Sequence, residues 1–141
     1  MKEVIVLVGA PGSGKSTYCK NHLKEYYRIN QDDLGRDEQW FYFEQALLDA
    51  LPLIVIDRMN FNKEFRSKYI IPAREKGYKI KIINFSQVPF ETCLKRTIER
   101  DNHPTIERGD ATTARKAIGN FFKRYEDIQP DEADEIVFVN E

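Results

Sequence analysis

The sequence predicts an α/β fold in which helices cover a mostly parallel, five-stranded sheet. Two short apolar runs, residues 4–8 and 53–57, have the β-branched composition of parallel strands that are buried on both faces. Strand-like and helix-like segments alternate along the chain, which favours parallel strands joined by helical crossovers. A glycine-rich turn follows the first apolar run and leads directly into the first helix-like segment.

The first half of the chain is expected to hold three strands and two helices. One helix follows the glycine-rich turn, and the other has apolar side chains at helical spacing and ends before Pro52. The segment after the first helix is a weaker strand candidate than the two apolar runs. In chain order, the expected elements are strand 4–8, helix 15–25, strand 26–30, helix 38–51 and strand 53–57.

The second half is expected to hold three helices and two strands. The first of these helices stops at Gly77, and the second has a proline in its first turn. The strand between them opens with alternating polar and apolar residues, as an outer strand would. In chain order, the expected elements are helix 63–76, strand 79–85, helix 89–100, a polar loop at 101–110, helix 111–125 and strand 135–139.

Length and composition fit one soluble globular domain. The chain has 141 residues, of which 41% are hydrophobic and 32% charged, and its net charge is −1. No apolar run approaches the roughly 20 residues of a membrane helix, and the first strand begins so early that we expect no signal peptide. Cys19 and Cys93 lack zinc-type or redox-type spacing, which favours reduced thiols in a cytoplasmic protein.

Residues 9–17, GAPGSGKST, contain a complete phosphate-binding loop motif, G-x-x-x-x-G-K-[ST]. The glycines let the backbone curl so that N–H groups point inward, and the following helix adds its positive dipole end. Lys15 is expected to reach the β- and γ-phosphates of a nucleotide, and the Ser16 hydroxyl to hold Mg²⁺. The alternative is an ordinary glycine-rich turn. The expected nucleotide-binding residues are Gly9, Ala10, Pro11, Gly12, Ser13, Gly14, Lys15, Ser16 and Thr17.

Asp57 ends the second apolar run, and ligands of parallel sheets bind beyond the carboxyl ends of the strands. A carboxylate at this place can organise Mg²⁺ directly or through water. The alternative is an aspartate that caps the turn after its strand. We therefore expect Ser16 and Asp57 to form the metal site.

A phosphate-binding loop alone does not separate kinases from other nucleotide-binding proteins. The segment RINQDDLGR, residues 28–36, is the next feature, and it favours a kinase only in combination with the loop and the arginines described below. Its adjacent aspartates, Asp32 and Asp33, follow a short strand that we expect next to the phosphate-loop strand. A carboxylate there can position an acceptor hydroxyl and take its proton. The alternative is that one of the two aspartates caps the following helix.

The segment CLKRTIERDNHPT, residues 93–105, has the features of a kinase lid. Arg96 and Arg100 are four residues apart, hence on one helical face, and they lead into a polar loop. Small P-loop kinases carry at this place a lid whose arginines close over the transferring phosphate. The lid would cover residues 96–115 approximately, and the alternative is a solvated basic face.

Together, these motifs resemble the kinase domain of phage-type polynucleotide 5′-kinases and, more loosely, the kinase domain of fungal tRNA ligases. GAPGSGKST matches the family's phosphate-binding loop, INQDD its acceptor segment, IDRMNFN its third-strand motif and LKRTIER its lid helix. The resemblance spans most of the chain. It implies a P-loop NTPase of the adenylate-kinase-like, three-layer type with a small lid, and a single kinase domain over residues 1–141. Nothing in the sequence resembles the aspartate motif of the phosphatase domain fused to the phage enzyme.

The resemblance also assigns roles to individual residues. Asp32 matches the general base, and Arg100 would contact the nucleotide phosphates. The family places a phosphate-binding arginine three residues after its base, but that position here is Gly35, and Arg36 is one further on. With the loop motif, it implies the catalytic residues Lys15, Asp32, Arg96 and Arg100, the metal-binding residues Ser16 and Asp57, and the substrate-binding residues Asp33, Arg36, Arg58 and Asn60.

Basic and aromatic side chains offer candidate contacts to a polynucleotide. Trp40 or Tyr42 can stack on a terminal base, although a core stripe is the simpler interpretation of the apolar spacing of Trp40, Phe43, Leu47 and Leu51. Two basic stretches can follow a phosphate backbone or form ordinary solvated faces. They are Lys63, Arg66, Lys68, Arg74, Lys76, Lys79 and Lys81, and Arg115, Lys116, Lys123 and Arg124.

The sequence therefore predicts an ATP-dependent phosphotransferase that uses Mg²⁺ with ATP (or GTP) and acts on the 5′-hydroxyl ends of DNA or RNA. The expected place is the cytoplasm, of a phage-infected or other host cell, with no membrane contact, and the sequence indicates no particular protein partner. One alternative is a small-molecule kinase for a nucleoside, sugar or other metabolite. The other is a nucleotide-binding switch or accessory module without acceptor chemistry.

Overall fold

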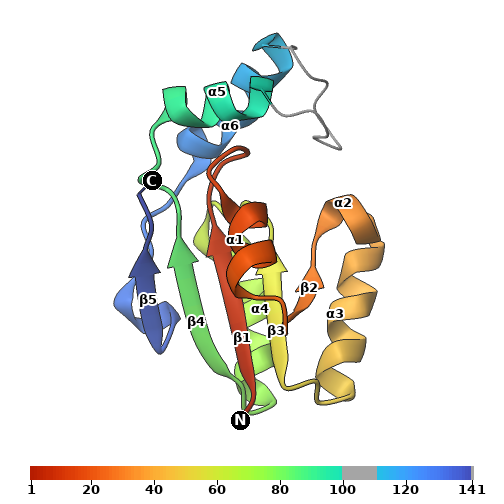
Figure 1. Ribbon diagram of the computed structural model, residues 1–141. Coiled ribbons are helices and arrows are strands. Elements are labelled where there is room, and N and C mark those ends of the chain that lie inside the picture. The colour runs from red at the N-terminus through yellow and green to blue at the C-terminus, as the bar shows by residue number, and fades with distance from the viewer. Residues whose placement is uncertain (100–110, 141) are drawn as a thin grey trace.

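Five parallel strands form one sheet in the order β2-β3-β1-β4-β5 (Figure 1). The structure, a computed structural model, describes residues 1–99 and 111–140. Every neighbouring pair of strands is parallel, so the prediction of a mostly parallel five-stranded sheet is confirmed. The strands are β1 (Glu3–Val8), β2 (Tyr27–Ile29), β3 (Leu53–Asp57), β4 (Lys79–Asn84) and β5 (Glu135–Phe138).

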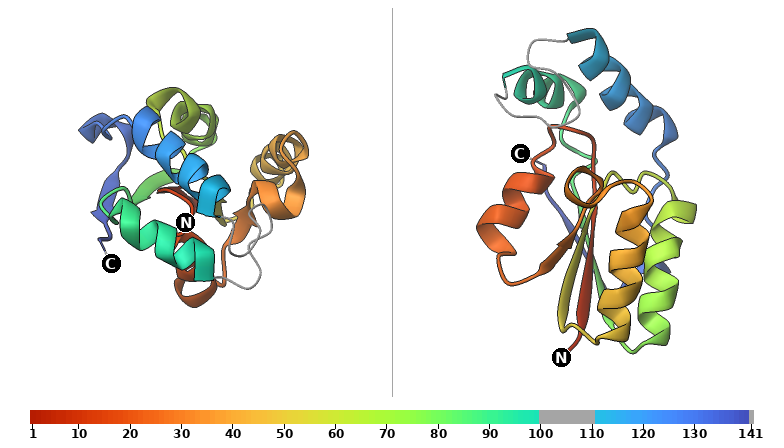
Figure 2. Two further views of the ribbon diagram at one scale, coloured as in Figure 1. Left: turned by 90° about the horizontal axis from the view of Figure 1, so that it is seen from above. Right: turned by 90° about the vertical axis from the view of Figure 1, so that its right-hand side faces the viewer.

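Helices on both faces of the sheet give the three layers that the sequence predicts. Helix α1 lies on one face, whereas α3 and α4 lie on the other (Figure 2). Helices α5 and α6 pack together above the carboxyl ends of the strands (Figure 1). The bounds are α1 (Lys15–His22), α2 (Gln31–Leu34), α3 (Glu38–Leu48), α4 (Lys63–Glu75), α5 (Phe90–Glu99) and α6 (Ala111–Arg124), with a 3₁₀ turn at Pro130–Glu132.

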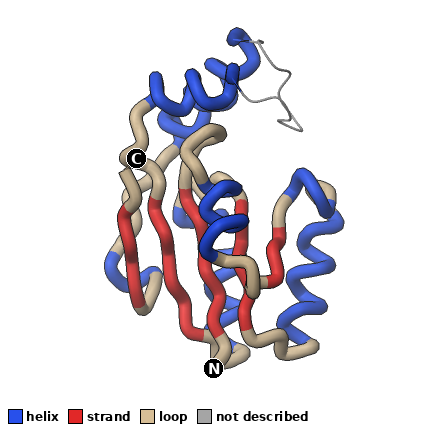
Figure 3. The backbone as a smooth tube through the Cα atoms, viewed as in Figure 1, coloured by secondary structure: helices blue, strands red, loops and turns tan. Residues whose placement is uncertain are grey.

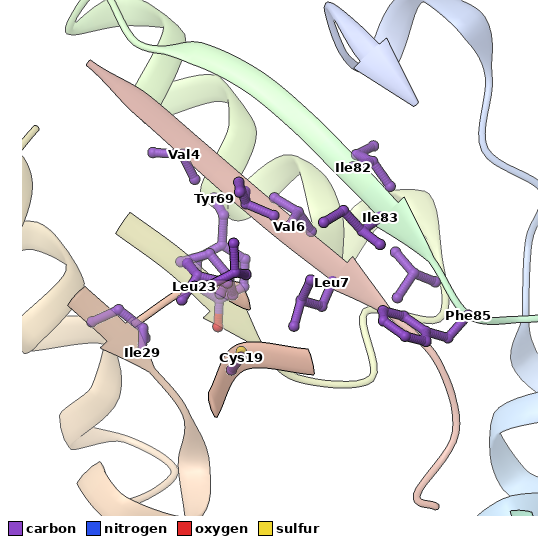
Figure 4. Close-up of a cluster of buried hydrophobic side chains, with 14 of the residues drawn as sticks. Val4, Val6, Leu7, Cys19, Leu23, Ile29, Tyr69, Ile82, Ile83 and Phe85 are labelled. Carbon is purple, nitrogen blue, oxygen red and sulfur yellow. The ribbon is translucent and has the colours of Figure 1, made fainter. Parts of the chain in front are cut away.

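The core is centred on β1, all of whose residues are buried because strands flank it and helices cover both faces. Figure 4 shows Val4, Val6 and Leu7 of this strand among side chains from the neighbouring strands and helices. This position explains the continuous apolar run of the first strand. The segments that follow the strands leave the sheet at one edge, opposite the N-terminus (Figure 3), and this edge carries the candidate site.

Two expected strand positions were wrong. Strand β2 pairs with β3, so it does not lie next to the phosphate-loop strand β1. Strand β4 lies between β1 and β5 and is not an outer strand. Its alternating start reflects Lys81, which lies 3.9 Å from Glu135 of the true edge strand. A polar residue in a strand can thus mark an ion pair with a neighbouring strand.

Helix ends also differ from the sequence-based bounds. The expected helices 15–25 and 38–51 end earlier, at His22 and Leu48. Ala50 has a left-handed backbone with φ of 53°, which ends the second of these before Pro52. The short helix α2 was not expected, and it carries the two acceptor-segment aspartates.

Arg66 is not part of a surface basic patch, contrary to the sequence-based expectation. Its side chain is fully buried on α4, where Nε donates to Glu132 Oε1 at 2.7 Å and Nη2 donates to Glu132 Oε2 at 3.2 Å. A third donor, Nη1, lies 3.1 Å from the Asn60 carbonyl oxygen. This ion pair therefore fixes α4 to the segment that precedes β5.

Replacing Arg66 by methionine should lower the free energy of unfolding by about 3–5 kcal/mol, because Glu132 would stay buried without its charged partner. Urea denaturation measures the change. Arg74→Met on the same helix is the control, since Arg74 is exposed and donates to the Asp131 carbonyl oxygen at 3.2 Å. It should change the free energy by no more than about 0.5 kcal/mol. Equal, small losses for both variants would contradict a structural role for the buried pair.

Candidate active site

The phosphate-binding loop connects β1 to the first turn of α1. Gly12 and Gly14 have φ of 80° and 106°, a left-handed backbone that favours glycine. A Cβ at Gly12 would also collide with the Cys93 carbonyl oxygen and lie 2.5 Å from Thr97 Oγ1, so α5 packs directly on the loop. Gly14 caps α1 without a side chain, which leaves the helix N-terminus open to an anion.

Lys15 is folded over this loop. Its side chain is largely buried, and Nζ donates to the carbonyl oxygens of Gly9 at 2.8 Å and Ala10 at 2.9 Å. The ammonium group is thereby held inside the ring of backbone where phosphates are expected. Contact with a nucleotide would require Nζ to turn from carbonyl oxygens to phosphate oxygens.

Ser16 and Asp57 meet, as the sequence predicts for a metal site. Ser16 Oγ lies 3.3 Å from Asp57 Oδ2, and the carboxylate is buried at the end of β3. A hydroxyl and a carboxylate are ligands that Mg²⁺ accepts. Among the described residues there is no group of three or more acidic, histidine or cysteine side chains that could hold a metal by itself. The pair therefore fits Mg²⁺ that takes its other ligands from nucleotide phosphates and water.

Arg28 of β2 completes this cluster, and the sequence analysis did not assign it a role. Its Nε and Nη2 donate to Asp57 Oδ2 at 2.8 and 2.6 Å, and Nη2 also lies 3.1 Å from Ser16 Oγ. Burial alone would lower the pKa of Arg28, but the charge and hydrogen bonds of Asp57 outweigh burial and raise the pKa. Arg28 therefore carries its charge at every physiological pH.

The contact between Arg28 and Asp57 follows from the register in which β2 pairs with β3. Arg28 pairs with Val55, two residues before Asp57, so Arg28 and Asp57 are diagonal neighbours on one face of the sheet. A strand with Arg28 beside β1, as expected from the sequence, would not have paired with the strand of Asp57. Correct pairing of β2 with β3 would have indicated the contact.

In the acceptor segment, Asn30 caps α2 by accepting a hydrogen bond from the Asp33 backbone N–H at 3.2 Å. Neither Asp32 nor Asp33 is the N-cap of a helix, so the capping alternative for these aspartates is wrong. Both side chains are exposed on the first turn of α2. They are therefore available for contacts with other molecules.

Gly35 ends α2 with φ of 90°, and a Cβ there would lie 2.6 Å from Glu38 Oε2. A left-handed backbone at this position explains why the chain has glycine where the resembling family has arginine. Arg36, one residue later, is exposed and lines the same cavity as Asp32.

One cavity of about 420 Å³ extends from the phosphate-binding loop to the acceptor segment. Lys15, Ser16 and Asp57 line it on the loop side, and Asp32 lines it on the acceptor side. Asp33 does not line this cavity and instead lies 3.6 Å from Arg28 Nη1. The structure thus brings the expected donor site, metal site and general base to one space.

The cavity is lined by Pro11, Gly12, Gly14, Lys15, Ser16, Arg28, Asn30, Gln31, Asp32, Arg36, Asp37, Trp40, Asp57, Arg58, Met59, Asn60, Phe61, Phe65, Lys68 and Tyr69.

Arg58 and Asn60 differ in their contacts, although the sequence analysis expected both to bind substrate. Arg58 lines the cavity and is held by two hydrogen bonds, to Tyr69 Oη at 2.9 Å and Gln31 Oε1 at 3.0 Å. Asn60 is buried, has φ of 48° and donates from Nδ2 to the Leu7 carbonyl oxygen at 2.8 Å. Its amide is thus used to hold the turn after β3 against β1.

Aromatic side chains form one wall of the cavity. Trp40 is half-buried and stacks on Tyr69, with ring centroids 4.4 Å apart and an interplanar angle of 14°. The ring centroids of Phe61 and Phe65 lie 5.0 Å apart, and Lys68 Nζ lies 5.3 Å from the Phe65 ring centroid. These side chains line the cavity, whereas Phe43 and Leu47 of the same expected stripe are buried in the core. Tyr42 does not line the cavity.

Arg96 lies on the phosphate-binding loop, where Nη1 donates to the Ser13 carbonyl oxygen at 3.3 Å. It also lines a second cavity of about 580 Å³, on the side of the loop next to Tyr18 and Val139. The loop glycines Gly12 and Gly14 line both cavities, so the loop lies between them. Arg100 and the expected lid loop 101–110 lie outside the described residues.

Comparison with known proteins gives relatives over parts of the chain. A family model for an AAA domain matches residues 4–40. A putative bifunctional polynucleotide phosphatase/kinase of Acanthamoeba polyphaga mimivirus is 35% identical over 79 residues, 55% of this chain and 19% of that protein. The bifunctional polynucleotide phosphatase/kinase of Schizosaccharomyces pombe is 29% identical over 148 residues, 89% of this chain and 36% of that protein. The transcription factor bHLH140 of Arabidopsis thaliana is 27% identical over 120 residues, 79% of this chain and 13% of that protein.

Solved structures match the whole fold. A fungal RNA kinase superposes with a TM-score of 0.74 at 19% identity, over 99% of this chain and 74% of that chain. A gluconokinase from Sinorhizobium meliloti superposes with a TM-score of 0.59 at 16% identity, over 98% of this chain and 82% of that chain. The chain has the fold of a P-loop kinase. Its resemblance to polynucleotide kinases, expected from the motifs, is confirmed, although the chain spans only 13–36% of the length of these curated relatives.

Proposed function

We propose that this protein transfers the γ-phosphate of ATP to the 5′-hydroxyl end of a DNA or RNA strand. The observation that carries the proposal is the cavity that joins Lys15 and Ser16 to Asp32. A phosphoryl transfer needs donor, metal and acceptor base in one space, with the attacking and leaving oxygens in line. The resemblance to polynucleotide kinases supports the same acceptor class. No helix in the described part of the chain is long and apolar enough to cross a membrane.

In this mechanism each residue has one task. Lys15 and the loop N–H groups bind the β- and γ-phosphates and compensate their charge. Ser16 and Asp57 would hold Mg²⁺, which supplies further positive charge at these phosphates. Asp32 accepts a hydrogen bond from the acceptor hydroxyl, orients it and takes its proton as the oxygen attacks. Arg100 of the expected lid, with Arg96 nearby, stabilises the charge that spreads over the transferred group.

The cavity walls favour a nucleotide-containing acceptor over a sugar or other small metabolite. Trp40, Phe61 and Phe65 offer aromatic surface, and bases of any sequence stack on such rings. Arg36 and Lys68 line the same cavity and can contact acceptor phosphates.

The acceptor assay tests the proposal directly. Transfer from radiolabelled ATP is compared among a 5′-hydroxyl oligonucleotide, a free nucleoside and water. The expected result is efficient transfer to the oligonucleotide alone. Equal rates with the nucleoside would favour a small-molecule kinase, and transfer to water alone would favour a nucleotide-dependent switch.

Salt dependence gives a second prediction about the acceptor. Acceptor binding should weaken as the salt concentration rises. The logarithm of the association constant, plotted against the logarithm of the salt concentration, should have a slope of about −0.7 for each contacted phosphate of a single strand. A short acceptor strand has few phosphates, so we expect a slope equivalent to only about two or three phosphate contacts. The Arg36→Glu/Lys68→Glu variant should flatten the slope, because both residues line the cavity.

The matched control reverses two exposed charges on α6, Arg115→Glu/Lys116→Glu. It should leave the slope unchanged if the strand lies along the cavity. A slope that is flattened only by the α6 variant would place the strand on that helix, and a wild-type affinity independent of salt would argue against a polynucleotide.

A further inference from the structure

The guanidinium of Arg28 lies where a cation of the expected metal site would bind. Three contacts of 2.6–3.1 Å connect Nε and Nη2 to Asp57 Oδ2 and Ser16 Oγ. The Asp57 side chain is 3% exposed, and that of Arg28 is 27% exposed. Arg28 is therefore the group that compensates the buried carboxylate in this state of the protein.

Arg28 and a metal ion cannot use these oxygens in the same way at once. Mg²⁺ requires ligands at about 2.0–2.1 Å in nearly ideal octahedral geometry. Asp57 Oδ2 already accepts hydrogen bonds from Arg28 and from the Ser16 hydroxyl, and Ser16 Oγ accepts one from Arg28. Two positive charges at this distance also repel each other. Direct coordination of a metal ion by Ser16 Oγ and Asp57 Oδ2 therefore requires the guanidinium to leave both oxygens.

A second anion lies within reach of Arg28. Nη1 is 3.6 Å from Asp33 Oδ2, and the Asp33 side chain is 68% exposed on α2. Asp33 follows Asp32 directly, so a stronger contact between Arg28 and Asp33 would act on the helix that carries the proposed base. Arg28 thus lies between the donor side and the acceptor side of the site.

We propose that Arg28 is a positioning residue that compensates Asp57 before the nucleotide binds and moves from Ser16 and Asp57 to Asp33 when metal and nucleotide bind. The inference rests on the proposed function for its donor site, though not on the nature of the acceptor. Arg28 opposes metal binding in the starting state and fixes α2 once the donor is in place. The contact with Asp33 then holds α2, and with it Asp32, in place beside the bound donor.

The experiment titrates Mn²⁺ into the protein at saturating ADP and follows free Mn²⁺ by electron paramagnetic resonance, which needs no activity. Arg28→Gln should bind Mn²⁺ more tightly than the wild type by about fivefold or more, the lower range of coupling between two ligands. Arg28→Lys keeps the charge and should stay close to the wild type. Lys24→Gln removes the same charge from an exposed position and should change the affinity by less than about twofold.

Asp33→Asn tests the second position of Arg28. It should weaken Mn²⁺ binding in the wild-type background, because Arg28 loses its destination, and should have no effect in the Arg28→Gln background. Unchanged or weaker Mn²⁺ binding by Arg28→Gln overturns the proposal, as does an equal effect of Asp33→Asn in both backgrounds. If Arg28→Gln does not fold, Arg28→Met, which also removes the charge, gives the same comparison with and without Asp33→Asn.

The proposed function can fail separately. Normal Mn²⁺–ADP binding with the expected variant effects, but no transfer to oligonucleotides, would leave the role of Arg28 intact and reject the acceptor. No Mn²⁺–ADP binding by any form of the protein would overturn both.

Discussion

Asp32→Asn should abolish phosphoryl transfer while ADP binding stays within about twofold of the wild type. Asparagine keeps the shape of the side chain and its place on α2, but it cannot take the acceptor proton. General-base catalysis contributes about 10²–10⁴-fold, so kcat should fall by that factor. A coupled transfer assay at saturating acceptor gives kcat, and fluorescence titration gives the ADP affinity.

Asp37→Asn is the matched control for this variant. Asp37 is exposed and lines the same cavity, and it begins α3 without a side-chain capping hydrogen bond. The control removes the same charge from the same space and should retain most of the activity. If Asp33→Asn loses transfer while Asp32→Asn stays active, the general base is Asp33 and not Asp32. Full activity of both would show that α2 carries no acceptor chemistry.

The sheet and its loop could be predicted because their signals are local. β-branched apolar runs indicate buried strands at β1 and β3, and the loop motif lies within one strand-turn-helix segment. The position of β2 could not be predicted in this way, since strand order depends on contacts between distant segments. Only three residues of β2 are in the strand, too few for a pattern to indicate the neighbouring strand.

The site shows the same division. Lys15, Ser16, Asp57 and Asp32 were predicted from motifs, and the structure places all four on one cavity. Arg28 was missed because its partner Asp57 is 29 residues away and on a strand that was expected elsewhere. Such contacts become visible only when the sheet register is known.

Arg66 shows that residue type alone does not define a basic surface. The side chain belongs to a lysine- and arginine-rich segment, which favours a solvated or phosphate-binding face. Its partner Glu132 is 66 residues away, so no spacing rule for helices could indicate the buried ion pair. The part of this segment that can contact an acceptor is Lys68, because it lines the cavity.

Lys15→Met should lower kcat by about 10²–10³-fold, the usual cost of removing one preorganised charge or donor from a transition state. The ammonium is already held at the loop by the Gly9 and Ala10 carbonyl oxygens, so only a turn of Nζ away from these oxygens is needed to bring it to the phosphates. Methionine has a similar length and keeps the packing of a largely buried side chain.

Two measurements separate this effect from a loss of folding. The melting temperature in the absence of nucleotide should change little compared with Lys24→Met, which removes an exposed charge shortly after α1. Stabilisation by added Mg²⁺–ATP should be strong for the wild type and for Lys24→Met, and weak for Lys15→Met, because a ligand stabilises a protein only as far as it binds the folded state. Near-normal turnover of Lys15→Met would remove the phosphate-binding loop from the mechanism. Normal stabilisation by nucleotide with a large loss of kcat would contradict the expected role of Lys15 in nucleotide binding and would mean that Lys15 acts on the transition state alone.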